Sequence, residues 1–470
     1  MLNLSCLRPG AVLGLLAAVA VVHNSPVASA APVARSGAAA PARVAGFSHV
    51  KSLGGIDEYR LDSNGLSVLL KPDHSAPVVT FQVTYRVGSR NEVTGTTGAT
   101  HILEHLMFKG SEKFNEAAGN GLTQYLGRAG AAFNATTWLD RTNYFATLGR
   151  DSLEGYVAIE ADRMRNLRLR DADLETEMTV VRNEYERGEN GPGNALEKEI
   201  WAVAYLAQPY HHSTIGWRSD IENVSTAKLR EFYDTFYWPD NATVTIVGDV
   251  EPEKALALVQ KYYGAIPRAP RAIPQVYTEE PPQHGARRVT VKRAGEPGIV
   301  MIAYKAVHAR DPDGPALSVL GSILSRGTNS RLSRALVDTS LASGADAGIP
   351  PTHDPGLFWV SAGLTPTATH EQVEKAILAE IERVKSDGVS ADEVKRVVNQ
   401  SRAGEAYGRD GTAGLAAALN EGIAVGDWTL VVTHAERISQ VTPADVQRVA
   451  RKYLREDQST TGWFVPVESK

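Results

Sequence analysis

Residues 101–105 (HILEH) place two imidazoles and a carboxylate at a spacing that suits metal chemistry. On a helix, His101 and His105 lie one turn apart on the same face, with Glu104 beside them. Two imidazoles at this spacing can hold one Zn²⁺, and the adjacent carboxylate can take a proton from a metal-bound water. The same five residues also fit an ordinary amphipathic helix. A third ligand is needed to decide between these interpretations.

A strongly helical, acidic stretch further along the chain offers that ligand. Residues 173–187 contain apolar side chains at helical spacing, which predict a buried stripe of Leu174, Met178, Val181 and Tyr185. Glu177 and Glu184 are seven residues apart and share one face beside this stripe. We expect one of them to be a metal ligand and the other to orient a ligand. Glu175 and Glu186 are expected to face solvent.

Several segments together resemble the pitrilysin family of zinc metallopeptidases, whose relatives include insulin-degrading enzyme and the mitochondrial processing peptidase. The family carries the inverted H-x-x-E-H motif of residues 101–105. The other matching segments are 88–92 (GSRNE), 106–110 (LMFKG), 134–136 (NAT) with Asp140, Thr142 and Tyr144, 180–184 (VVRNE) and 240–249 (DNATVTIVGD). The resemblance runs from about residue 50 to the end of the sequence.

The resemblance implies a role for each residue of the motif. By analogy with the family, His101, His105 and Glu184 bind Zn²⁺, and Glu104 is the general base that activates water to attack a peptide carbonyl. Glu177 would orient a histidine or the substrate. The expected function is therefore zinc-dependent endopeptidase activity on peptides or unfolded polypeptides.

The family also uses the segment around residues 133–136 as a substrate-binding edge strand. The resemblance therefore implies that Phe133, Asn134 and Ala135 bind the substrate, through backbone groups that pair with an extended peptide. A plain structural edge strand, in which Asn134 caps a turn, is the alternative. The substrate role rests on the resemblance alone.

The sequence departs from the family at one functional position. Active relatives carry an Arg and a Tyr seven residues apart in a later domain, where they hold the substrate carbonyl. Here Val337 occupies the Arg position and Ser343 or the next residue occupies the Tyr position, with Arg334 and Tyr407 as candidate replacements. Two-domain members of the family work as dimers. We therefore expect a related subunit that carries the Arg/Tyr pair (a heterodimer), or a homodimer. The alternative function is a peptide-binding or structural subunit with little hydrolysis of its own.

The N-terminus indicates export. Residues 11–22 form an apolar run and residues 28–30 (ASA) fit a signal-peptidase site, so residues 1–30 are predicted to be a signal peptide. Residues 31–45 are expected to be a flexible leader. Cleavage would give a periplasmic or secreted protein with no stable membrane insertion, whereas an uncleaved anchor is the alternative. The single cysteine, Cys6, would be removed, which excludes disulfides and cysteine catalysis in the mature chain.

Length and composition predict two domains. We expect a zinc-binding catalytic domain at 46–266, a proline-rich linker at 267–285 and a second homologous domain without a metal site at 286–470. The predicted fold class is α+β: each domain has a mainly antiparallel sheet with helices on one face, and the two form half of a clamshell. A net charge of −5 without a basic cluster argues against nucleic acid as a partner.

A weak internal repeat supports the two-domain prediction. A predicted strand at 243–250 is followed by a helix that ends near Gly264. A predicted strand at 358–364 is followed by a helix at 371–385. We interpret the two strand–helix pairs as equivalent parts of two similar domains.

Overall fold

The computed structural model describes residues 41–408 and 411–467. The predicted signal peptide and residues 31–40 of the predicted leader lie outside the described residues. Pro41–Lys470 group into one compact unit. No helix or strand lies between residues 263 and 287 of this described segment, where the linker is predicted. The two domain boundaries stay a prediction.

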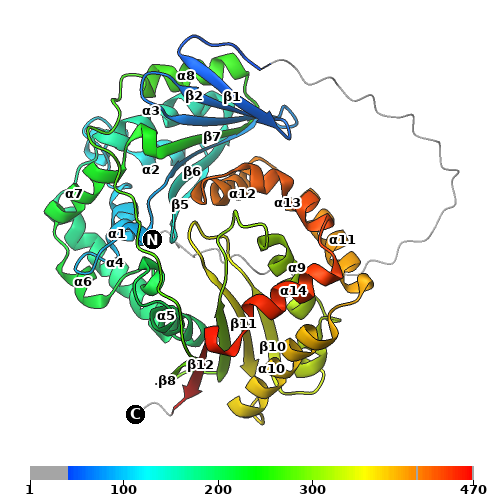
Figure 1. Ribbon diagram of the computed structural model, residues 1–470. Helices are drawn as coiled ribbons and strands as arrows, with labels where there is room; N and C mark the ends of the chain where they lie inside the picture. The colour runs from blue at the N-terminus through cyan, green and yellow to red at the C-terminus, as the bar shows by residue number, and fades with distance from the viewer. Residues whose placement is uncertain (1–40, 409–410, 468–470) are drawn as a thin grey trace, which may run out of the picture. The chain divides into compact units, whose positions relative to one another are not determined.

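Seven strands of the first half form one sheet, in the order β1-β2-β3-β7-β4-β6-β5 (Figure 1). Only β3 and β7 pair in parallel. Strand β5 lies at one edge, as expected for this segment. The strands are β1 (Phe47–Leu53), β2 (Ile56–Leu61), β3 (Ser67–Pro72), β4 (Val78–Tyr85), β5 (Ala132–Thr137), β6 (Thr142–Gly149) and β7 (Ala242–Gly248).

Five strands of the second half form a second sheet, in the order β10-β11-β9-β12-β8. Here β12 and β8 are the parallel pair, and the other neighbours are antiparallel. The strands are β8 (Arg287–Arg293), β9 (Ile299–Lys305), β10 (Ala342–Gly348), β11 (Leu357–Leu364) and β12 (Ser459–Pro466).

The two sheets share one topology. The order β3-β7-β4-β6-β5 and the order β8-β12-β9-β11-β10 contain the same succession of one parallel and three antiparallel pairs. Strand β7 therefore corresponds to β12, and β11 corresponds to β6. Our pairing of the strand at 243–250 with that at 358–364 was wrong, because a strand followed by a helix recurs within each half. Only the hydrogen-bonded neighbours identify the equivalent strand.

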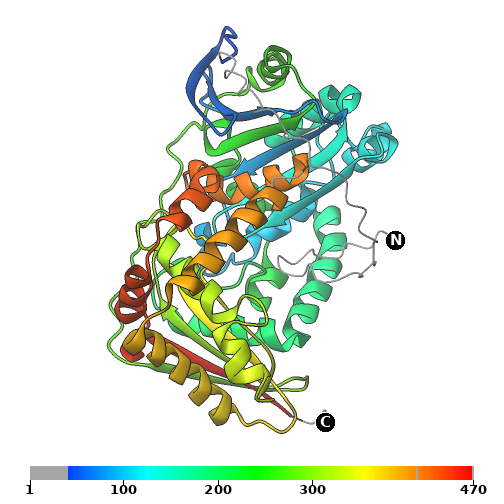
Figure 2. The same cartoon turned by 90° about the vertical axis from the view of Figure 1, so that its right-hand side faces the viewer.

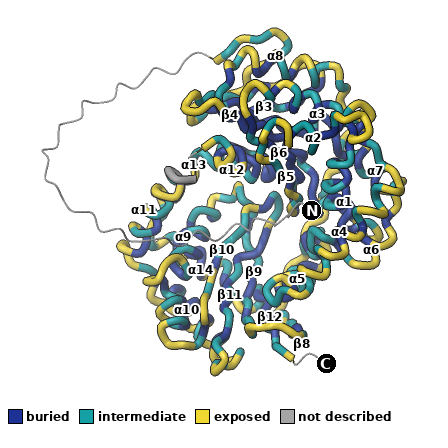
Figure 3. The backbone as a smooth tube through the Cα atoms, turned by 180° about the vertical axis from the view of Figure 1, so that it is seen from behind, coloured by how far each residue is buried: buried dark blue, intermediate teal, exposed yellow. Residues whose placement is uncertain are grey.

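Helices fill the sequence between the strands. Those of the first half are α1 (Ala99–Leu106), α2 (Leu122–Arg128), α3 (Leu153–Arg165), α4 (Asp171–Asn190), α5 (Pro192–Ala204), α6 (Arg218–Asn223), α7 (Thr226–Phe236) and α8 (Pro252–Tyr263). Those of the second half are α9 (Gly314–Ser325), α10 (His370–Asp387), α11 (Ala391–Gly408), α12 (Thr412–Ala424), α13 (Thr429–Ser439) and α14 (Pro443–Tyr453). Each half has its own large hydrophobic core, and the central strands β4 and β7 of the first sheet are almost entirely buried (Figure 3). The predicted α+β class is confirmed.

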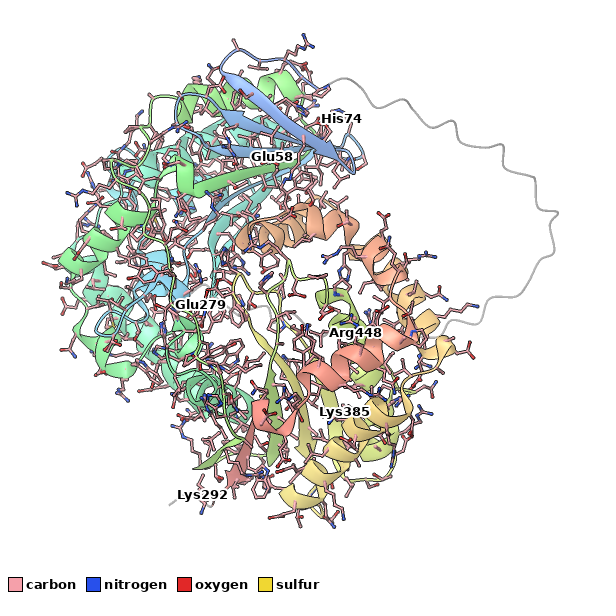
Figure 4. The ribbon with its side chains drawn as sticks, viewed as in Figure 1. Glu58, His74, Glu279, Lys292, Lys385 and Arg448 are labelled. Atoms are coloured by element: carbon pink, nitrogen blue, oxygen red, sulfur yellow. The ribbon has the colours of Figure 1, made fainter. Side chains whose placement is uncertain are left out.

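Each sheet is covered on its other face by a helix from the opposite half. Helix α12 lies along β4 and β7 of the first sheet (Figures 1 and 2). Its contacts are partly polar: Thr80 Oγ1 donates to Thr412 Oγ1 at 2.7 Å, and Thr84 Oγ1 donates to Asn420 Oδ1 at 2.7 Å. Just beyond α12, Trp428 Nε1 donates to Glu58 Oε2 at 2.8 Å (Glu58 is labelled in Figure 4).

Helix α5 makes the reciprocal contact. It packs on β8, β9 and β12 of the second sheet. Leu196 and Ile200 of α5 share a buried cluster with Ala303 and Phe464. The sequence predicted helices on one face of each sheet but not this exchange of covering helices between the halves.

The described residues contain no single helix long and apolar enough to cross a membrane. Helices α12 and α13 are long and apolar enough only when taken together, and the chain bends by 91° between them.

Candidate metal centre

Helix α1 presents the H-x-x-E-H residues on one face because its opposite face is anchored in the core. Ile102, Leu103 and Leu106 are fully buried. The helix begins after Gly98, whose φ of 87° is in the left-handed region that favours glycine. The remaining face carries His101, Glu104 and His105, which are only partly buried.

The buried Glu92 carboxylate holds the first turn of α1. It accepts hydrogen bonds from the backbone N–H groups of Gly98 and Thr100, each at 2.8 Å. Free N–H groups at a helix N-terminus need such acceptors. Burial raises the pKa of Glu92 to about 8, against the lowering effect of these two bonds. Glu92 thus fixes the helix that carries the motif, and the sequence pattern alone did not reveal this contact.

Helix α4 supplies the acidic residues. Of the predicted buried stripe, Met178 and Val181 are buried, whereas Leu174 and Tyr185 are only partly buried against the same core. Glu175 and Glu186 are exposed, as expected. The helix packs against α1.

Three side chains converge at the contact between α1 and α4. The ligand atoms of His101, His105 and Glu184 all lie within 4.8 Å of one another. Glu184 Oε2 is 3.6 Å from His101 Nε2 and 3.4 Å from His105 Nε2. Two ligands bound tetrahedrally to one Zn²⁺ at ordinary bond lengths lie about 3.4 Å apart. The donor set and its spacing therefore fit a zinc ion. No other such group of three occurs in the described parts of the chain.

Glu177 fixes the orientation of one histidine. His105 Nδ1 donates to Glu177 Oε2 at 3.0 Å, and Lys109 Nζ donates to the other oxygen of Glu177. Burial opposes protonation of His105, but hydrogen bonds to Glu177 and Glu184 raise its pKa to about 10. Both ring nitrogens therefore face carboxylates. The bond to Glu177 keeps a proton on Nδ1, and Nε2, which faces Glu184, is the nitrogen that would give up its proton to bind a metal ion.

The other histidine stays neutral. Burial and the neighbouring His105 lower the pKa of His101 to about 4. Its Nδ1 is buried and has no hydrogen-bond partner among the described residues.

Burial also raises the pKa of the Glu104 carboxyl above its ordinary value. Its Oε2 accepts a hydrogen bond from Thr137 Oγ1 at 2.5 Å.

Strand β5 runs beside α1, and its outer edge is unpaired within the sheet. Trp138 N donates to Arg141 O at 2.9 Å, and Thr136 lies opposite Asn143. Because bonded and non-bonded pairs alternate in an antiparallel ladder, the backbone groups of Phe133, Ala135 and Thr137 point outward. The outward N–H of Ala135 donates to Asn134 Oδ1 at 2.9 Å, so the side chain of Asn134 occupies this donor.

The residues at the family's Arg/Tyr positions lie in the second half. Val337 ends a π-helical turn, Ser333–Val337. Ser343 is exposed on β10, the edge strand of the second sheet, and its hydroxyl donates to Gly363 O at 3.2 Å. Arg334 is exposed in the same π-helical turn, and the side chain of Tyr407 lies outside the described residues.

Comparisons with known families identify the chain. The model described as Insulinase (Peptidase family M16) matches residues 67–217, and the model described as Peptidase M16 inactive domain matches residues 223–401. The zinc protease PqqE of Helicobacter pylori is 31% identical over 408 residues, which cover 86% of this chain and 91% of that protein. The chain belongs to the M16 family of peptidases, whose members include insulinase- and pitrilysin-like proteins. The mitochondrial-processing peptidase subunit beta of Lentinula edodes is 26% identical, over 90% of this chain and 92% of that protein.

Solved structures show the same fold. The crystal structure of a protease from Helicobacter pylori has a TM-score of 0.84 and 30% identity, and the match covers 88% of this chain and 100% of that one. The periplasmic protease PqqL of Escherichia coli has a TM-score of 0.73 at 18% identity, with 89% of this chain and 48% of that chain covered. The two-sheet arrangement is therefore that of the half-clamshell proteins of the M16 family.

Proposed function

We propose that this chain is a zinc-dependent endopeptidase that hydrolyses peptides or unfolded polypeptides. The observation that carries the proposal is the convergence of His101, His105 and Glu184 on one point, with the Glu104 carboxylate on the same helix face. The names of the relatives, which include zinc proteases, support it.

The proposed roles follow from the positions of the side chains. Zn²⁺ held by His101, His105 and Glu184 would act as a Lewis acid toward the scissile carbonyl and would lower the pKa of the attacking water. Glu104 takes the proton of that water on the carboxylate oxygen that Thr137 leaves free. Glu177 keeps the proton of His105 on Nδ1 and so keeps its other nitrogen available as a ligand.

Strand β5 is the proposed substrate site. An extended peptide would pair with the outward backbone groups of Phe133 and Ala135, taking the place of Asn134 Oδ1 at the N–H of Ala135, and would add a strand to the first sheet. Backbone pairing of this kind selects extended, unstructured segments and reads little of their sequence. The side chain of Asn134 lies at the same edge, where its Oδ1 accepts from the N–H of Ala135.

The test is hydrolysis of a mixture of unstructured fluorogenic peptides by the purified, zinc-loaded chain beside Glu104→Gln. The wild type should bind zinc and cleave, while Glu104→Gln should keep its zinc and lose roughly 10²–10⁴-fold in turnover. Zinc content is measured by atomic absorption in both proteins. A fully active Glu104→Gln, or a wild type that binds no zinc, would refute the proposal.

The second candidate is a peptide-binding or structural subunit with little hydrolysis of its own. Val337 and Ser343 favour it, because Val337 has no side-chain donor for the substrate carbonyl and the hydroxyl of Ser343 already donates to Gly363 O. Zinc binding without turnover would support this candidate.

We propose that such a chain works with a related subunit that carries the Arg/Tyr pair, or as a homodimer. One relative is itself named as a subunit. Purification from the native host, followed by mass spectrometry, identifies the partner.

We further propose that the protein acts in the periplasm or outside the cell. The N-terminal apolar run and the small residues at 28–30 support this location. A protein of the same fold is described as a periplasmic protease. Cell fractionation with an antibody to the chain tests the location.

A further inference from the structure

One hydroxyl group contacts the proposed general base. Thr137 Oγ1 donates to Glu104 Oε2 at 2.5 Å, across 33 residues of sequence. Glu104 belongs to α1 and Thr137 is the last residue of β5, so this bond joins the motif helix to the edge strand. Both side chains are partly buried.

The strand geometry makes the contact specific to Thr137. Successive side chains of a strand point to opposite faces. The neighbouring Thr136 therefore points away from α1: its hydroxyl donates to Asn143 Oδ1 at 2.5 Å and accepts from Arg141 Nη1 at 2.6 Å. Two adjacent threonines thus have separate partners, and only the hydroxyl of Thr137 reaches Glu104.

The end of β5 is itself held in place from the second half. Arg141 Nη1 donates to the carbonyl of Thr136 at 3.3 Å, and the Nε and Nη2 of Arg141 donate to Glu421 Oε1 at 3.0 and 2.6 Å. Glu421 lies on α12, which covers the first sheet. Thr137 lies opposite Thr142 in the sheet, and the residue before it is held by Arg141, which the ion pair to Glu421 fixes in turn. Its β-branched side chain adds stiffness at χ1.

We propose that Thr137 is a positioning residue that holds Oε2 of Glu104, so that the other carboxylate oxygen is presented to the reacting water. The proposal rests on the function proposed above, in which Glu104 is the base. A carboxylate bound by one oxygen loses the nearly free rotation that terminal sp³–sp² torsions otherwise allow. Hydrogen bonds to charged groups are about twice as strong as neutral ones, so a single hydroxyl is sufficient.

A purely structural role for the hydroxyl makes a different prediction. If Thr137 only satisfies its own hydrogen-bonding capacity, its removal would lower stability and leave turnover per folded molecule unchanged. If it positions Glu104, its removal lowers kcat and leaves peptide binding unchanged, because the outward backbone groups of β5 are retained.

The test compares Thr137→Val, which removes the hydroxyl at constant shape, with Thr137→Ser, which keeps it. Thr290→Val makes the same chemical change at an exposed position of β8, and is the matched control. In the zinc-loaded chain, Thr137→Val should lose roughly 10–100-fold in kcat with KM within about twofold, and Thr137→Ser should recover most of the loss. Peptide affinity, measured by fluorescence anisotropy in the Glu104→Gln background, should not change on adding Thr137→Val.

A second measurement separates this inference from the proposed function. Melting temperatures of wild type, Thr137→Val, Glu104→Ala and the double variant report the bond without catalysis. Thr137→Val should lower the melting temperature by roughly 1–3 °C in the wild type and by less when Glu104 is absent. A wild type that cleaves no peptide refutes the proposed function, and additive melting shifts refute the positioning role whatever the activity. The positioning role is also refuted if Thr137→Val has the same kcat as the wild type, or if Thr137→Ser has a kcat as low as that of Thr137→Val.

Discussion

Leu419 provides a test of the exchange of covering helices between the two halves. It lies on α12 and is fully buried in a cluster with Ile56, Leu69 and Val247 of the first half. Leu419→Ala removes three carbon atoms from this contact. Because the site is closed on both sides, we expect little collapse of the surrounding residues and a cavity in the variant.

The size of the effect follows from measured losses for buried leucines. A Leu→Ala change in a core costs about 2–5 kcal/mol, and about 3 kcal/mol corresponds to a roughly 150-fold rise in the population of the open state. In this open state, α12 has separated from the strands of the first sheet, which precede it by more than 150 residues. Amide exchange should therefore rise in β3, β4 and β7 as well as in α12 itself.

Hydrogen–deuterium exchange with mass spectrometry measures this directly. The peptides to follow are 67–85 and 242–248 in the first sheet, with 342–364 in the second sheet as an internal reference. Leu378→Ala, at a position of α10 that is 41% exposed, is the matched control and should change little. Leu196→Ala on α5 should give the mirror result, with faster exchange in β8 and β12. A rise confined to residues 411–439 in Leu419→Ala would refute the reasoning.

Two further predictions concern the metal centre and the contact between the halves. Glu177→Gln should weaken zinc binding by roughly 10–100-fold, because His105 loses the carboxylate that holds the proton on its Nδ1. Competition with a fluorescent chelator measures the zinc affinity. An unchanged affinity would contradict the orienting role of Glu177. Asp354 pairs with Arg90 at 2.6 Å, and although burial opposes its ionisation, hydrogen bonds from His353 and Arg90 hold its pKa below the usual value. Asp354→Asn should therefore be less stable than wild type near neutral pH. The difference should begin to shrink as the pH falls below about 4, where the unfolded chain takes up the proton, and should vanish only below the lowered pKa of the folded state. Urea unfolding at several pH values checks this; a difference in stability that is as large at pH 3 as at pH 7 would contradict it.

The metal-binding candidates could be predicted from the sequence because their spacing is local. His101 and His105 share one helix face by periodicity, and Glu177 and Glu184 share another. The resemblance to a family then indicated that the two faces meet. The structure brings all four side chains together. The edge position of β5 followed from the same resemblance and is confirmed.

Contacts that depend on the packing of distant elements could not be predicted. Nothing in the local pattern distinguishes Thr137 from Thr136, because the partner of each depends on which face of β5 meets α1. Glu421 lies 280 residues from Arg141, on a helix whose apolar face resembles that of any core helix. The roles of Phe133, Asn134 and Ala135 in substrate binding, the domain boundaries and the partner subunit stay predictions.

The exchange of α5 and α12 also has a consequence for the order in which the chain can fold. When the first seven strands have been synthesised, one face of their sheet still lacks α12, which is made more than 160 residues later. The hydrogen bonds of Thr80, Gln82 and Thr84 to α12 cannot form until then. The N-terminal half therefore cannot reach its final state on the ribosome ahead of the C-terminal half. A nascent chain arrested before residue 411 should remain sensitive to protease in β4, whereas the complete chain should not.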